Sequence, residues 1–138
     1  MTVQEKVAHK IERLREYVQY LGECRKYSPD DLKKDPLVRG AVERYLHLAA
    51  ECVIDIAEII IAERGLRKPE EYREAIEILG EAGILSGDFA VYFAPIAGFR
   101  NILVHEYAKI DLDEVYRHLQ KDLPDFEKFI HFIVLHLK

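Results

Sequence analysis

PLVRGAVERYLHLAAECVIDIAEIIIAERG, residues 36–65, carries the longest run of helical periodicity in the chain. Its apolar residues recur at steps of three and four, which places them on one face of an α-helix. They are Val38, Val42, Tyr45, Leu46, Ala49, Val53, Ile56, Ala57 and Ile60. Asp35-Pro36 marks a start for this helix and Gly65 suits its C-cap. We therefore expect this segment to be the longest helix and the spine of the fold.

Further helical segments flank the spine and are joined by short loops. The same reasoning predicts helices at about residues 3–24, 69–79, 88–104 and 111–137. Ser28 is the expected N-cap of a short turn before residue 36, and Gly80 and Gly83 weaken the helix at 69–79. Pro95 removes a backbone donor and predicts a kink, while Pro124 predicts either an interruption or a second helix start. Because no segment is typical of a strand, the sequence predicts an all-α, up-and-down bundle of about five helices.

Length and composition indicate one ordered domain over residues 1–138. A chain of 138 residues with 49% hydrophobic content can bury one core and is too short for two. Charged residues make up 33% of the chain and both signs alternate, which is typical of a globular protein. The formal net charge of -5 argues against indiscriminate binding to phosphate backbones. Any contact with nucleic acid must be local or created by assembly.

Targeting and metal signals are missing from the sequence. The charged N-terminus lacks the apolar run of a signal peptide, and no apolar stretch is long enough to span a bilayer. We therefore expect a cytoplasmic protein without a membrane segment. Cys24 and Cys52 lack partners at zinc spacing, so we interpret them as reduced core thiols. The Glu-x-x-His pairs of di-iron bundles are also missing, and we expect neither a metal nor another cofactor.

The chemistry of the chain concentrates in GFRNILVHEY, residues 98–107. Arg100, His105 and Tyr107 combine a permanent positive charge, a group that titrates near neutrality and a phenolic hydroxyl, which suits a phosphodiester. In a continuous helix, Arg100 and His105 would be about 140° apart around the axis. Either the helix ends or distorts near His105, or the site is assembled across a two-fold axis from two copies of the chain. The second solution predicts a symmetric homodimer.

The run from Arg100 to Tyr107 resembles the Arg-x-x-x-x-His-x-Tyr motif of the HEPN superfamily, and in particular of HepT-like toxins from toxin–antitoxin pairs. The similarity extends over nearly the whole chain. Residues 42–45 and 50–57 resemble the family's second helix, and residues 107–111 its turn after the motif. Asn101 matches the polar residue that this family often places after its Arg.

The resemblance implies a HEPN-like bundle that acts as a homodimeric, metal-independent endoribonuclease on RNA. Arg100 would neutralise charge on the transition state, His105 would act as general base or acid, and Asn101 would be a further residue of the catalytic site. The resemblance also implies a second partner, a minimal nucleotidyltransferase antitoxin that silences the toxin by transferring AMP to Tyr107.

Several alternatives remain open at the level of sequence. His47, Glu51 and Asp55 follow one another at four-residue steps, so they either form a second polar wall of the cleft or are a solvated face. Taken singly, Arg100, His105 and Tyr107 could also be ordinary structural residues. The competing function is a HEPN domain without catalysis, which binds nucleotide or substrate for a nucleotidyltransferase or serves as its antidote.

Overall fold

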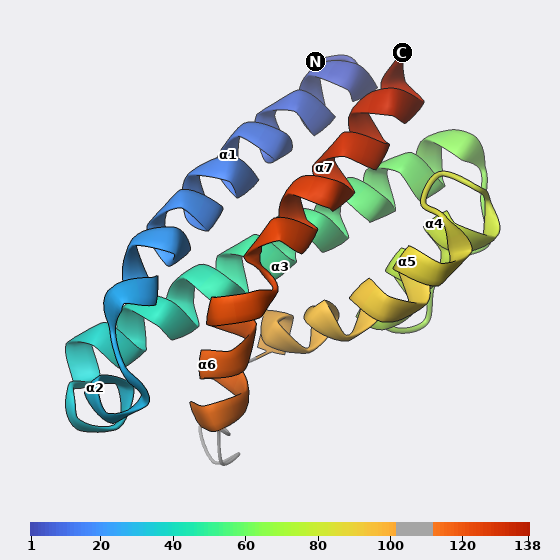
Figure 1. Ribbon diagram of the computed structural model, residues 1–138. Coiled ribbons are helices and arrows are strands. Elements are labelled where there is room, and N and C mark those ends of the chain that lie inside the picture. Colours follow the sequence, from blue (N-terminus) through green and yellow to red (C-terminus); the bar gives the residue numbers. More distant parts are fainter. Residues whose placement is uncertain (102–111) are drawn as a thin grey trace.

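The computed structural model describes residues 1–101 and 112–138, and every regular element in these ranges is a helix (Figure 1). The elements are α1 (Val3–Glu23), η1 (Cys24–Lys26), α2 (Pro29–Lys34), α3 (Pro36–Arg64), α4 (Tyr72–Glu81), α5 (Gly87–Phe93), η2 (Ala94–Asn101), α6 (Leu112–Lys121) and α7 (Leu123–Leu137), of which η1 and η2 are 3-10 helices. The prediction of an all-α bundle is confirmed.

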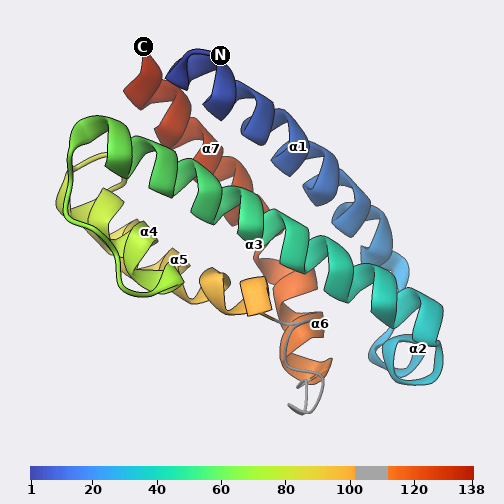
Figure 2. The same ribbon diagram turned by 180° about the vertical axis from the view of Figure 1, so that it is seen from behind.

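Helix α3 is the predicted spine, and its ends are the predicted ones. The Asp35 side chain accepts hydrogen bonds from the backbone N–H groups of Leu37 and Val38, at 3.0 and 3.4 Å. Gly65 ends the helix with φ of 64°, a left-handed conformation that glycine adopts without strain. Helix α3 runs the length of the molecule (Figures 1 and 2).

The other helices divide between the two sides of α3. Helix α1 packs along α3 in the opposite direction, with α7 beside α1, so the two termini lie close together (Figures 1 and 2). Helices α4 and α5 and the 3-10 helix η2 pack on the other side. This arrangement puts η2, which carries Arg100, directly against the spine.

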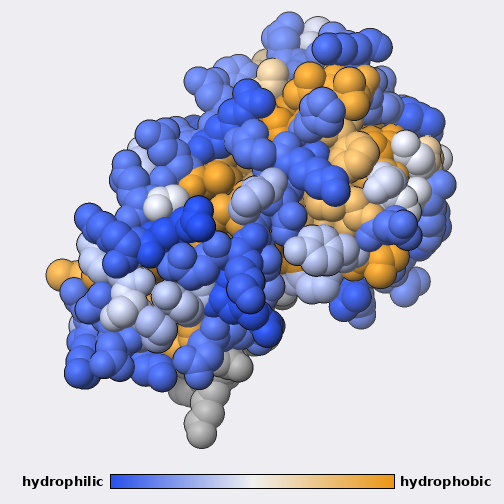
Figure 3. Space-filling view, in the orientation of Figure 1, coloured by the Kyte–Doolittle hydropathy of each residue, from blue (hydrophilic) through white to orange (hydrophobic). Residues whose placement is uncertain are grey.

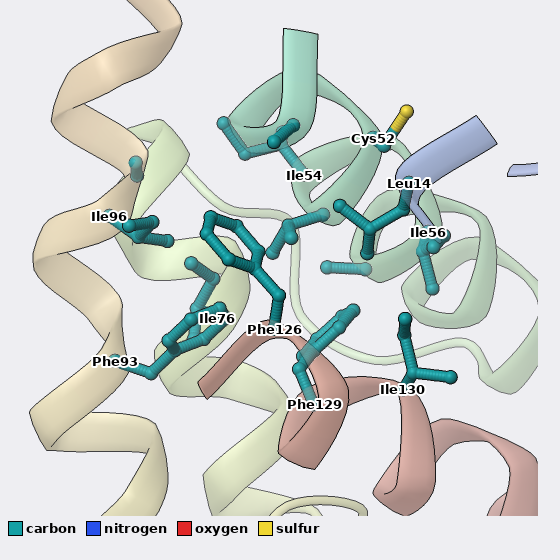
Figure 4. Packing of buried hydrophobic residues seen from close by; sticks show 14 of the residues in the cluster. Leu14, Cys52, Ile54, Ile56, Ile76, Phe93, Ile96, Phe126, Phe129 and Ile130 are labelled. Carbon is teal, nitrogen blue, oxygen red and sulfur yellow. The ribbon is translucent and has the colours of Figure 1, made fainter. Parts of the chain in front are cut away.

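Aromatic side chains join α5 to α7 in the core. The Phe93 ring lies 5.7 Å from the Phe126 ring and 5.5 Å from the Phe129 ring, centroid to centroid, and all three side chains are buried (Figure 4). Ile96 of η2 is buried in the same cluster. The core therefore anchors both the helix that leads into η2 and η2 itself.

The surface is uneven in hydropathy. On the face shown in Figure 3, hydrophobic atoms gather over α5 and the C-terminal half of α7, whereas hydrophilic atoms dominate over α2 and α6. Val91 and Leu135 are among the exposed apolar residues of α5 and α7. None of the described helices is both long enough and apolar enough to cross a membrane.

On the N-terminal side of the chain one predicted element is longer than expected and one predicted boundary was wrong. The start predicted at Ser28 is confirmed, since Ser28 and Asp31 form a reciprocal capping box, but the segment is a short helix, α2, and not a single turn. Helix α4 begins at Tyr72 rather than near residue 69, because Glu71 is extended. In the loop before α4, Arg67 forms ion pairs with Glu74 and Glu81, which connect this loop to the helix.

Helix α4 ends close to the two glycines that were predicted to weaken it, although Gly80 itself is still helical. The helix continues to Glu81, and Gly83 follows it with φ of 77°. A Cβ atom at Gly80 would come within 2.5 Å of the Ala90 Cβ atom. Glycine is needed there because α4 and α5 approach each other closely, not because the chain turns.

The predicted fourth and fifth helices are both divided at their prolines. Helix α5 ends at Phe93 and continues as the 3-10 helix η2, since Pro95 has no N–H for an α-helical hydrogen bond. The predicted end of that helix at Val104 lies outside the described residues. The segment predicted at 111–137 consists of α6 and α7, separated at Asp122. Pro124 lies in the first turn of α7, where a missing N–H is tolerated, so it marks a second start.

Candidate functional site

Arg100 lies near the end of η2 and faces two other elements. Its Nη2 atom is 3.7 Å from Oε1 of Glu51 on α3. Its guanidinium carbon is 5.4 Å from the centre of the Tyr72 ring at the start of α4. Because 27% of the Arg100 side chain is exposed, the guanidinium is held by these contacts and still accessible from solvent. A planar guanidinium offers five N–H donors, and one loose ion pair leaves most of them for a ligand.

Glu51 also links Arg100 to His47, one helical turn earlier on α3. The Nε2 atom of His47 is 3.6 Å from Oε2 of Glu51, on the carboxylate whose other oxygen faces Arg100. His47 is only 7% exposed, and its Nδ1 atom has no hydrogen-bond partner among the described residues. A buried, unpaired ring nitrogen is costly, so its presence requires an explanation beyond packing.

Asp55, the third member of the predicted polar wall, belongs to a different contact. Its Oδ2 atom accepts a hydrogen bond of 3.0 Å from Nζ of Lys10 on α1. That hydrogen bond raises the pKa of Lys10 above its ordinary value, although desolvation opposes the shift. The structure thus brings His47 and Glu51 together with Arg100 and directs Asp55 toward α1.

Glu58 is a further acidic residue near Arg100, and the sequence interpretation did not include it. Partial burial raises the pKa of the Glu58 carboxyl, and the charge of Asp55 adds to that rise. The positive charge of Arg100 acts in the opposite direction. The guanidinium therefore lies near two carboxylates of α3, those of Glu51 and Glu58.

Phe99 fixes the backbone next to Arg100. Its ring packs edge-on against the His118 ring of α6, with centroids 4.9 Å apart. His118 is held in turn by Asp122, and Glu114 lies 3.7 Å from its Nε2 atom. Through this ring contact, helix α6 packs against the end of η2.

The rest of the predicted motif is only partly described. Asn101 is the last residue of η2, and the structure describes its backbone but not its side chain. His105 and Tyr107 lie outside the described residues. Their predicted roles remain predictions.

Two grooves flank this part of α3. One, of about 610 Å³, lies between α4 and η2 and is lined by Glu58, Pro69, Glu70, Glu71, Tyr72, Arg73, Ala94, Pro95, Ala97 and Gly98. The other, of about 360 Å³, lies between α1 and α3 and is lined by His9, Lys10, Arg13, Tyr17, Leu48, Glu51, Cys52 and Asp55. Tyr72 lines the first groove and also contacts Arg100, so that groove opens beside the guanidinium.

The described part of the chain offers neither a metal-binding group of side chains nor a reactive thiol. Within residues 1–101 and 112–138, no group of three or more His, Cys, Asp or Glu side chains is arranged to hold a metal ion. Cys24 and Cys52 are free, and burial raises the pKa of the Cys52 thiol to about 11. A thiol with such a pKa is protonated at neutral pH and a poor nucleophile.

Most of the sequence matches the model of a known protein family. The family model described as "Ribonuclease HepT-like" matches residues 7–133. The chain belongs to the HepT-like ribonuclease family. The resemblance seen in the sequence motif is thus confirmed over almost the entire chain.

Curated relatives and a solved structure support the same assignment. The mRNA nuclease HepT of Shewanella oneidensis is 32% identical over 101 residues, which cover 73% of this chain and 76% of the relative. The tRNA nuclease HepT of Aphanizomenon flos-aquae is 30% identical over 124 residues, 90% of this chain and 84% of the relative. A tri-AMPylated HEPN toxin of Shewanella oneidensis, solved in complex with MNT antitoxin, has a TM-score of 0.83 at 27% identity and covers 94% of this chain and 96% of that one.

Some residues around Arg100 were missed by sequence reasoning. Tyr72 and His118 come from segments outside the motif, and only the tertiary structure brings Tyr72 to Arg100 and His118 to Phe99. Phe99 itself stands directly before the motif Arg, within the segment 98–107. Tyr72 carried no signal in the sequence, because an aromatic residue at a helix start is ordinarily a packing residue.

Proposed function

We propose that this chain is the toxin of a toxin–antitoxin pair and acts as a metal-independent endoribonuclease. The observation that carries this proposal is the HepT-like match over residues 7–133, which includes the complete Arg100, His105 and Tyr107 motif. The accessible guanidinium of Arg100, braced by Glu51 and Tyr72, supports it, since RNA cleavage needs a fixed positive group at the phosphate.

The reaction is an intramolecular transfer within RNA. The ribose 2′-oxygen attacks the adjacent phosphorus, the bond from phosphorus to the 5′-oxygen breaks, and the products are a 2′,3′-cyclic phosphate and a 5′-hydroxyl. His105 takes the proton of the 2′-hydroxyl or delivers one to the leaving 5′-oxygen. Arg100, with Asn101 beside it, neutralises the charge that accumulates on the phosphate oxygens.

The active form is a two-fold homodimer. Two copies of the motif facing one cleft supply two imidazoles, one for each proton transfer, and two guanidinium groups. The second guanidinium also raises the local positive potential in the cleft. A chain with net charge -5 can therefore still attract an RNA phosphate at that place.

The partner is a nucleotidyltransferase antitoxin that transfers AMP to Tyr107. The related HEPN toxin with MNT antitoxin is tri-AMPylated, which supports this kind of control. On Tyr107, AMP would add bulk and negative charge close to His105 in sequence and exclude the RNA phosphate. Mass spectrometry after incubation with antitoxin and ATP should show added AMP on the wild type and none on Tyr107→Phe, and a wild type without added mass would contradict this step.

The protein acts in the cytoplasm, where its RNA substrates are and where thiols stay reduced. The free Cys24 and Cys52 are consistent with that compartment. The competing function is a HEPN domain that binds nucleotide or RNA without cutting it, including an antidote to its nucleotidyltransferase.

A 2′-deoxy substitution separates cleavage from binding. An RNA that is cut at a defined position should become resistant when the nucleotide 5′ of the scissile phosphate carries a 2′-deoxyribose, because the nucleophile is gone. The deoxy substrate should still bind and compete with the intact RNA. Equal cleavage of both substrates would exclude the 2′-hydroxyl mechanism.

A further inference from the structure

The groove between α4 and η2 has two features that the proposed cleavage chemistry does not use. It has a volume of about 610 Å³, and Tyr72 forms part of its wall. The Tyr72 residue is 40% exposed, although its ring also contacts the guanidinium of Arg100. The ring therefore presents a large accessible surface at the edge of the groove.

The second feature is the position of the groove relative to Arg100. The guanidinium carbon of Arg100 lies 5.4 Å from the centre of the Tyr72 ring, so a phosphate bound at Arg100 would lie directly beside the groove. In single-stranded RNA, the bases next to a phosphate are free to stack on aromatic side chains. The nearest aromatic surface to such a phosphate, among the described residues that line the groove, is Tyr72.

The charges of the groove decide which part of a nucleotide can enter it. Glu58, Glu70 and Glu71 line it, against the single positive residue Arg73. Carboxylates repel phosphate groups, but they accept hydrogen bonds from the N–H groups on the edge of a base. The groove is thus unsuited to the RNA backbone and suited to a base.

We propose that this groove is a nucleobase subsite, in which Tyr72 stacks on a base next to the phosphate held by Arg100. This inference rests on the proposed function for the presence of RNA at Arg100, and it adds a binding residue outside the motif. Tyr72 then has two contacts, the guanidinium of Arg100 and the base, and it couples the position of the phosphate to the position of the base.

A double-mutant cycle between protein and RNA tests this subsite. The probe is a short, fluorescein-labelled single-stranded RNA, intact or with an abasic ribonucleotide at each position in turn. Binding is measured by fluorescence anisotropy in the His105→Ala background, so that cleavage cannot affect the result. Tyr72→Leu removes the ring, Tyr72→Phe keeps it, and Tyr92→Leu removes an exposed tyrosine that lies on α5 and does not line the groove.

The expected result is a loss that depends on both partners. At one position, the abasic substitution should raise Kd by about tenfold when residue 72 is Tyr or Phe, in the range found for base–aromatic stacking. In Tyr72→Leu the same substitution should change Kd by less than about twofold, the margin for independent sites. Tyr92→Leu should behave as the parent does.

Two results would overturn the subsite. Equal abasic effects in the Tyr and Leu backgrounds at every position would make Tyr72 only a support for Arg100. If Tyr72→Leu instead leaves RNA binding unchanged and slows AMP transfer to Tyr107, the groove holds the adenine of that AMP and not an RNA base. Because binding is read without cleavage, failure of the wild type to cut RNA would reject the proposed ribonuclease and leave this cycle interpretable.

Discussion

The charged residues on the two sides of helix α3 differ in how closely they are paired. Toward α1, Asp55 and Lys10 form a single, short hydrogen-bonded pair at 3.0 Å. Toward η2, Glu51 divides its carboxylate between His47 and Arg100 at 3.6 and 3.7 Å, and Nδ1 of His47 has no partner in the described part of the chain. In the first arrangement each charge has an opposite partner at hydrogen-bond distance. The second keeps donors available, which is the condition of a binding site and not of a structural pair.

The largest effect that separates the two sides is expected at Arg100. Arg100→Ala should lower kcat/KM for RNA cleavage by about 100- to 1000-fold, as removal of one transition-state donor does in other enzymes. The midpoint of thermal unfolding should hardly change, since the ion pair with Glu51 is long and partly exposed. Steady-state cleavage and thermal denaturation on the same samples measure both quantities. Full activity in a folded Arg100→Ala dimer would show that the side of α3 toward η2 is no more a binding site than the side toward α1.

An intermediate effect is expected at His47. His47→Leu replaces a buried imidazole that has an unpaired nitrogen with an apolar side chain of similar size. The free energy of unfolding should stay the same or rise by about 1 kcal/mol, because an unsatisfied buried polar atom is removed. Cleavage should fall several-fold, since Glu51 loses the neighbour that orients it toward Arg100.

Urea denaturation and RNA cleavage distinguish these two effects of His47→Leu. A loss of stability above about 2 kcal/mol would indicate that Nδ1 of His47 has a partner after all, because breaking a buried hydrogen bond has that cost. His131 is exposed on α7, and His131→Leu therefore serves as a matched control with no effect on either measurement.

The smallest effect is expected on the α1 side. Lys10→Met should reduce the free energy of unfolding by less than about 1 kcal/mol, because both partners are substantially exposed and the pair is screened by solvent. RNA cleavage should not change. High salt should remove most of the difference from the wild type.

The pH dependence of the Lys10 contribution follows from its raised pKa. The stabilisation is fully present below the ordinary lysine pKa of 10.5 and is lost as pH rises through the higher pKa of the folded state. The difference in stability between wild type and Lys10→Met should therefore be constant from neutral pH to about pH 10 and shrink above it. A difference that changes between pH 6 and 9 would show that another group carries the effect.

The spine was predictable from sequence because local and global signals agree there. Asp35, Pro36 and Gly65 mark the ends of α3, and the apolar period between them matches the buried face. The sequence predicted where the helices are divided, at Pro95 and Pro124, but not what kind of division each proline makes. A proline tells where a helix is disturbed, whereas tertiary packing decides whether the result is a kink, a 3-10 helix or a new start.

The site was predictable only as far as the motif and the α3 stripe allowed. His47 and Glu51 lie on the face toward η2, but Asp55 is rotated far enough around α3 to meet Lys10 instead. The sequence spacing of four residues could not distinguish these partners, because it does not say which helix packs on which side. Tyr72 was not predictable at all, since its contact with Arg100 depends on how α4 and η2 meet.

The most direct test of the account is metal-free cleavage of total RNA, in EDTA, by purified wild-type and His105→Ala proteins that are each verified as dimers. The account predicts cleavage by the wild type alone, with 2′,3′-cyclic phosphate ends on the fragments. No cleavage by either dimer would contradict it and favour the nucleotidyltransferase partner that binds without cutting. Equal cleavage by both would place the chemistry on residues other than His105.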